Sequence, residues 1–125
     1  MLELKDLCFD VNSDGAEKEI IRNVNLSVDK NRFAVITGPN GGGKSTMAKL
    51  IAGIETPSSG KILFEGQDIT SMSITDRAKL GIGFAFQQPV RFKGLEVIDL
   101  LRLATGKTIS VDAACDYLSE VGLCA

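Results

Sequence analysis

A glycine-rich stretch between two apolar segments constrains this chain more than any other feature. It matches the phosphate-binding pattern G-x-x-x-x-G-K-[ST], and it comprises Gly38, Pro39, Asn40, Gly41, Gly42, Gly43, Lys44, Ser45 and Thr46. The preceding residues 32–37 are mostly apolar, which is typical of a strand buried on both faces. The following residues place Met47, Leu50 and Ile51 at helical spacing. Strand, glycine-rich loop and helix is the context that this pattern requires.

The residue types in this stretch suit a chain of phosphates. Glycines allow backbone N–H groups to approach phosphate oxygens without an intervening Cβ atom, and the start of a helix adds partial positive charge. In this pattern Lys44 contacts the β- and γ-phosphates, and the hydroxyl of Ser45 is a ligand of Mg²⁺. The alternative is a glycine-rich turn that contains a lysine by chance.

Composition excludes several other classes. The 125 residues carry a formal net charge of −2, which argues against a broad nucleic-acid surface. No apolar run has the length of a membrane-spanning helix, and residues 1–6 do not resemble a signal peptide. Three cysteines without C-x-x-C spacing indicate reduced thiols and a cytoplasmic location. The chain contains no histidine, so a histidine base or ligand is excluded.

The remaining pattern predicts an α/β chain. Strands are expected at 2–11, 19–28, 32–37, 61–64 and 82–86, with turns at 12–15, 29–31, 56–60 and 65–68. A change of phase at Lys5-Asp6 indicates a bulge in the first strand. Helices are expected at 44–52, from Ser73 to Gly81, and twice after residue 95. The last two have apolar faces formed by Val97, Leu100, Leu101 and Ala104, and by Val111, Ala114, Cys115, Leu118 and Val121.

The order of these motifs resembles the nucleotide-binding domain of ATP-binding-cassette (ABC) proteins. Besides the phosphate loop, the resemblance rests on Thr56-Pro57-Ser58-Ser59-Gly60, on the turn 64–69 and on Phe86-Gln87. It implies a P-loop NTPase fold with an antiparallel β subdomain, incomplete at the C-terminus. It divides the chain into a β subdomain and P-loop core at about 1–94 and the start of a helical subdomain at about 95–125. It also implies ATP and Mg²⁺ as cofactors.

Two further positions take roles from this resemblance. Gln87 would reach Mg²⁺ and the attacking water, which suits an amide that both donates and accepts hydrogen bonds. A polar loop residue without such a role is the alternative. Many transporter ATPases stack an aromatic ring on adenine near the end of the first strand, and that position is Val11 here. Val11, with the loop 85–90 and Gly94, makes the chain most similar to the SufC-type ATPase of iron–sulfur cluster assembly.

The sequence lacks the later motifs of the ABC family, which are the Leu-Ser-Gly-Gly-Gln signature, an apolar strand ending in Asp-Glu, and a switch histidine. We therefore expect the 125 residues to bind nucleotide without appreciable turnover. The resemblance implies a head-to-tail dimer with a second ABC ATPase subunit, and scaffold proteins of SufB and SufD type as partners. The alternatives are a membrane transporter subunit, peripheral to the membrane through a permease, and a truncated module that binds nucleotide without hydrolysing it.

A partner surface is expected in and after the loop 87–94. Val90, Phe92 and Leu95 are apolar residues in a stretch with little around them to bury them, and Arg91 and Lys93 alternate with them. The alternative is a loop that packs on its own helices.

Overall fold

Two long antiparallel strands form the largest element of the computed structural model, which describes residues 1–13, 16–88 and 90–123. They are β1 (Leu2–Ser13) and β2 (Ala16–Val28). β1 thus includes Asn12 and Ser13, the first two residues of the turn predicted at 12–15. Residues 14–15 of that turn lie outside the described residues. β3 (Ser59–Phe64) pairs with the other edge of β1, and the two-residue β4 (Gln67–Asp68) completes the sheet order β2-β1-β3-β4.

The predicted bulge in β1 is confirmed. Asp6 has φ 48°, and the register of β1 with β2 shifts between Leu4 and Leu7. Because of this extra residue, Leu4, Leu7 and Phe9 are all buried, although Leu4 and Leu7 are three positions apart in the sequence. The side chain of Asn25 stabilises the bulge, since its Oδ1 accepts from the N–H of Asp6 at 3.0 Å and its Nδ2 donates to Oδ1 of Asp6 at 3.0 Å.

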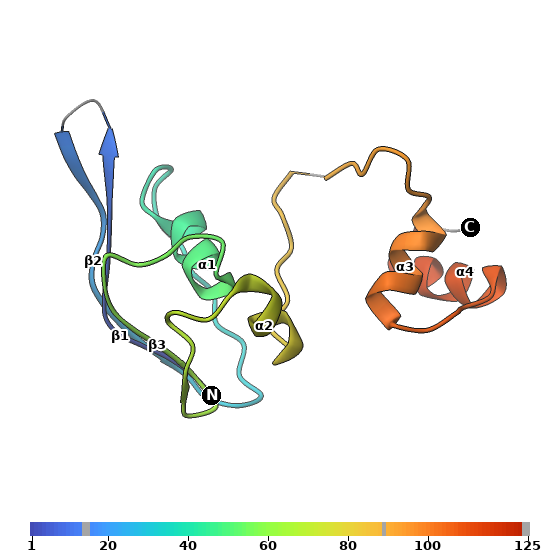
Figure 1. The fold of residues 1–125 in the computed structure, drawn as a ribbon, viewed down its shortest axis with the longest axis horizontal. Helices are drawn as coiled ribbons and strands as arrows, with labels where there is room; N and C mark the ends of the chain where they lie inside the picture. Colours follow the sequence, from blue (N-terminus) through green and yellow to red (C-terminus); the bar gives the residue numbers. More distant parts are fainter. Residues whose placement is uncertain (14–15, 89, 124–125) are drawn as a thin grey trace. The chain divides into compact units, whose positions relative to one another are not determined.

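The core lies between this sheet and helix α1 (Lys44–Ala52), which packs on one of its faces (Figure 1). Leu50 of α1 is fully buried, and so are Ile62 of β3 and Ile69. Gly53 ends α1 in a left-handed conformation, with its N–H donated to the carbonyl of Leu50. Burial of one apolar helix face thus fixes α1, and with it the loop that precedes α1.

Helix α2 (Ile74–Lys79) begins at the predicted Ser73 cap. The Ser73 hydroxyl accepts from the N–H of Asp76 at 3.2 Å and donates to its carboxylate at 2.7 Å. The turn predicted at 65–68 is shorter, because Glu65 and Gly66 both have positive φ and form a two-residue hairpin loop. Gln67 and Asp68 are therefore strand residues.

The strands predicted at 32–37 and 82–86 are absent, and this is the main correction to the sequence-based fold. Both segments have no regular secondary structure. Phe33 is 93% exposed and Val35 is 73% exposed. A strand needs a hydrogen-bonded neighbour as well as an apolar sequence, and neither segment has one among the described residues.

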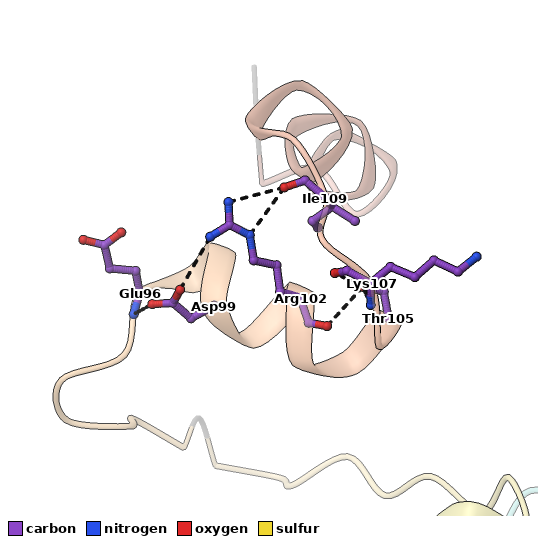
Figure 2. A network of polar contacts seen from close by, with 6 residues as sticks. All are labelled: Glu96, Asp99, Arg102, Thr105, Lys107 and Ile109. Atoms are coloured by element: carbon purple, nitrogen blue, oxygen red, sulfur yellow. Dashed lines mark hydrogen bonds and ion pairs between the residues drawn. The ribbon is translucent and has the colours of Figure 1, made fainter.

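The chain divides into two compact units, Met1–Ala85 and Phe86–Ala125. The second contains α3 (Val97–Thr105) and α4 (Val111–Glu120), and Ser110 caps the start of α4. Figure 2 shows how Arg102 of α3 connects the two helices: its guanidinium donates to the carbonyl of Ile109 at 3.4 Å and pairs with Asp99 at 3.8 Å.

The two predicted helix faces in this unit are only partly covered. Ala114 is buried, whereas Val97 is 58% exposed and Val111 is 65% exposed. No helix in the described part of the chain is long and apolar enough to cross a membrane.

Candidate functional site

The stretch 38–46 forms a loop that leads directly into the first turn of α1. The N–H of Gly42 donates to the carbonyl of Pro39 at 3.1 Å and closes a turn, and the N–H of Met47 donates to the carbonyl of Gly43 at 2.8 Å as the helix begins. Gly43 caps α1 without a side chain, and the first turn contains no acidic residue. The first N–H groups of a helix have no intrahelical partner, so this end of α1 is suited to an anion.

Gly43 is the glycine of the loop that the structure most clearly requires. Its φ is 80°, and a Cβ atom there would lie 3.0 Å from the carbonyl oxygen of Ile20 on β2 and 3.3 Å from the side chain of Ile21. The loop therefore passes so close to β2 that a side chain would push the two apart. This contact places the start of α1 against the antiparallel sheet.

Lys44 extends back over the loop. Its Nζ donates to the carbonyl of Gly38 at 2.7 Å and to that of Pro39 at 2.5 Å, and the residue is half-buried. The ammonium group thus lies within the curve of the loop, between its two ends. A phosphate held by the loop would meet a cation that is already in place.

Ser45 follows on the first turn of α1 and is exposed. No group of three or more acidic, histidine or cysteine side chains in the described part of the chain could hold a metal ion. A hydroxyl is nevertheless the kind of oxygen ligand that Mg²⁺ accepts beside phosphate oxygens and water. Ser45 therefore fits a Mg²⁺ ion that arrives with a nucleotide, and the chain offers no separate metal cage there.

A small cavity adjoins the loop. Its volume is about 190 Å³, and its walls come from β2, from Ile36 and Thr37, and from Gly42, Gly43, Lys44 and Met47. That volume is below the roughly 300 Å³ at which ligand pockets usually begin, so the cavity could hold only part of a nucleotide. Ile20 and Arg22 line it. Neither residue could be predicted for the site, because nothing in the sequence indicates how closely β2 approaches the loop.

The other two predicted site residues are Val11 and Gln87. Val11 pairs with Lys18 in the hairpin and packs against the core, and it is not among the residues that line the cavity. Gln87 is exposed and belongs to the second compact unit.

Comparison with known proteins decides the family. The family model of the ABC transporter matches residues 21–123. The chain belongs to this ABC family. An uncharacterised ABC transporter ATP-binding protein of Methanocaldococcus jannaschii is 43% identical over 97 residues, which cover 76% of the chain and 39% of that protein. A probable ATP-dependent transporter of Pyropia yezoensis, ycf16, is 46% identical over 106 residues, or 83% of the chain and 41% of the relative.

A solved structure agrees on the fold. The dimeric, post-hydrolysis ATP-binding cassette MJ0796 with ADP and phosphate matches with a TM-score of 0.81 and 24% identity, over 96% of the chain and 57% of that structure. The chain thus has the P-loop ABC nucleotide-binding fold with its antiparallel sheet, as predicted. It spans about two fifths of the length of the two curated relatives, since the matches cover 39% and 41% of them.

Proposed function

We propose that the chain binds ATP through residues 38–46 as part of an ABC ATPase. One observation carries the proposal: Lys44 is held over the loop by the carbonyls of Gly38 and Pro39, beside a helix start that has no side-chain cap. A cation and a row of unpaired N–H groups that face the same space favour closely spaced phosphate oxygens.

Each site residue has a separate role in nucleotide binding or hydrolysis. The backbone of 38–46 holds the phosphates, and Lys44 neutralises charge on the β- and γ-phosphates. Ser45 would hold Mg²⁺, which would supply positive charge to offset that of the phosphates. Gln87 would help to hold the metal ion and would orient the water, and Val11 would offer adenine an aliphatic surface. Hydrolysis is proposed for the protein at its natural length, where Lys44 and Gln87 are the catalytic residues of this chain.

Replacement of Lys44 tests the nucleotide site. Lys44→Ala should weaken ATP binding by about tenfold or more, because a charge-assisted hydrogen bond contributes about 1.5–3 kcal/mol. The control is Lys49→Ala, which removes the same charge from the last turn of the same helix, where the residue is exposed. Isothermal titration calorimetry should show near-normal ATP affinity for Lys49→Ala. Equal affinity of Lys44→Ala and the unmodified chain would refute the site.

The biological role that we favour is the ATPase subunit of a SufC-like iron–sulfur cluster assembly complex. It rests on the aliphatic Val11, on the loop 85–90 and on Gly94. In that role two ATPase subunits pair head to tail in the cytoplasm and move scaffold proteins of SufB and SufD type. The alternative is a membrane transporter subunit, peripheral to the membrane through a permease, and the description of both relatives as transporter proteins favours it. Copurification with scaffold proteins or with a permease separates these roles.

The loop after Gln87 is proposed as the partner surface in either role. Val90 is 48% exposed, Phe92 is 52% exposed and Leu95 is 46% exposed. Leu95 also lines an open hollow of about 580 Å³ with Arg102 and Lys107. Apolar side chains in such a partly charged, exposed surface often mark an interface.

Phe92→Ser should weaken capture of the partner and leave ATP affinity unchanged. Val111→Ser is the matched control, because it removes an exposed apolar side chain from α4 in the same unit. A pull-down with the copurifying partner measures the effect. Capture that is equally strong for both variants would contradict the assignment of this loop.

A further inference from the structure

Arg77 is a charged residue in an unusual environment. It lies in the middle of α2 and is only 2% exposed, which makes it one of the most buried side chains in the described part of the chain. Four hydrogen bonds satisfy its guanidinium, and all four acceptors are backbone carbonyls. Burial lowers the pKa of Arg77, but an arginine in a protein keeps its charge at neutral pH.

Two of these carbonyls belong to the last turn of α1. Nη1 donates to the carbonyl of Leu50 at 2.7 Å and to that of Ile51 at 2.9 Å. The last carbonyls of a helix lack intrahelical partners and carry partial negative charge, so a buried cation there both satisfies and complements them. Arg77 thus caps the end of α1 that lies opposite the phosphate loop.

The other contacts of Arg77 reach two further segments. Nη2 donates to the carbonyl of Thr70 at 2.9 Å and Nε to that of Met72 at 3.1 Å, both in the connection from β4 to α2. The backbone carbonyl of Arg77 accepts from the N–H of Ile82 at 3.1 Å, at the start of the segment that leads to Gln87. One residue therefore joins the end of α1, the connection before α2 and the segment after it.

Gly53 provides the space for this arrangement. A Cβ atom at Gly53 would lie 3.0 Å from Nε, 3.1 Å from Cδ and 3.2 Å from Cζ of Arg77. The guanidinium thus packs directly on the C-cap of α1, and its several donors in a fixed planar arrangement allow it to reach both the end of α1 and the connection before α2.

We propose that Arg77 is a positioning residue for the nucleotide site: by holding the C-terminal end of α1, it sets the placement of the loop 38–46 at the other end. α1 has nine residues, so its ends are only about 13 Å apart. A short helix that tilts at one end moves its other end, and phosphate-binding donors tolerate little displacement. The proposal rests on the proposed function, in which this loop binds ATP.

The experiment compares Arg77→Met, Arg77→Lys and a control, Lys79→Met, in the protein at its natural length. Lys79 belongs to the same helix, and its side chain is 74% exposed in a surface pair with Asp76. Calorimetry with ATP gives affinity and stoichiometry separately. Arg77→Met should raise the ATP dissociation constant by about tenfold with unchanged stoichiometry, Arg77→Lys should raise it less, and Lys79→Met should leave it within about twofold.

Unchanged ATP affinity in folded Arg77→Met would overturn the proposal. So would a fall in stoichiometry at constant affinity, because that result means that part of the protein is unfolded and the rest binds normally. If Arg77→Met does not fold, Arg77→Lys decides by the same criteria, since it retains the charge but loses the planar set of donors.

Amide hydrogen exchange without nucleotide keeps this test separate from the proposed function. Arg77→Met, or Arg77→Lys in its place, should accelerate exchange at residues 46–49 of α1 by about tenfold relative to Lys79→Met. If neither the unmodified protein nor Lys79→Met binds ATP, the proposed function fails while this exchange result still decides the role of Arg77. Equal exchange in the Arg77 variant and in Lys79→Met would contradict positioning of α1 by Arg77.

Discussion

Gly60 lies against β1 where no side chain fits. Its φ is 90°, and a Cβ atom there would lie 2.4 Å from the carbonyl oxygen of Asp6 and 2.6 Å from the Cα of Leu7. This is the bulge of β1, so the closest approach of β3 to β1 coincides with the extra residue that turns Leu4 and Leu7 to the same face. The position therefore requires glycine for both its conformation and its space.

Gly60→Ala should lower the free energy of unfolding by about 3 kcal/mol, because backbone strain and the clash with β1 act together. Gly66→Ala is the control: its φ of 79° imposes the strain, but no atom lies within 4 Å of the added Cβ. Urea unfolding should show a loss of only about 1 kcal/mol for Gly66→Ala. If both variants lost the same free energy of unfolding, the backbone of β1 would have shifted to accommodate the added Cβ atom, and the predicted clash would be contradicted.

The glycines of the loop and Lys44 could be predicted from sequence. Phosphate binding requires particular residue types at a fixed spacing, and this pattern is visible in the sequence. Arg77 could not be predicted, because an arginine in a short helix usually lies in solvent, and its burial depends on carbonyls that are more than twenty residues away. Ile20 could not be predicted either, because only the folded hairpin places it against Gly43.

At the scale of elements, local signals predicted the structure well and partner-dependent signals did not. The capped helices and the hairpin formed where turn and cap residues indicated, because their hydrogen bonds lie within a few residues or across one turn. The segments 32–37 and 82–86 have the apolar composition of buried strands but form none, since a strand's hydrogen bonds come from its neighbours.

The β3–β4 hairpin should respond to acid through Asp68. The hydroxyl of Thr70 donates to Oδ1 of Asp68 at 2.6 Å and the N–H of Thr70 donates to it at 2.9 Å, and these hydrogen bonds lower the pKa of Asp68. A lowered folded-state pKa means that the stabilisation is present above the unfolded pKa of about 3.9 and disappears as pH falls through the folded value.

Asp68→Asn should therefore lower the free energy of unfolding at pH 7, and its difference from the unmodified chain should shrink as pH falls below about 4. Urea unfolding at several pH values measures this. Asp76→Asn is the control, since its carboxylate lies in another element. If the difference in unfolding free energy between Asp68→Asn and the unmodified chain is instead the same at pH 7 and at about pH 3, Asp68 is excluded as the source of the acid sensitivity.

At the scale of the whole molecule, the two units contribute different parts of the proposed activity. The unit Met1–Ala85 contains the phosphate loop, α1 and Arg77, while Phe86–Ala125 contains Gln87 and the proposed partner surface. The first unit also exposes Phe33 and Val35 beside the loop, and the second exposes Phe92. The family resemblance instead predicted a boundary at about residue 94, with Gln87 and Lys44 in the same part of the chain.

The central claim is that nucleotide binds at the loop 38–46, and an NMR titration of the isotope-labelled chain with ATP tests it most directly. The largest amide shifts should fall on Gly41 to Ser45 and the next on Ile20 and Ile21, which lie against Gly43. The amides of α4 should not move. Saturable shifts centred elsewhere, or a loop that does not respond to ATP, would contradict the account.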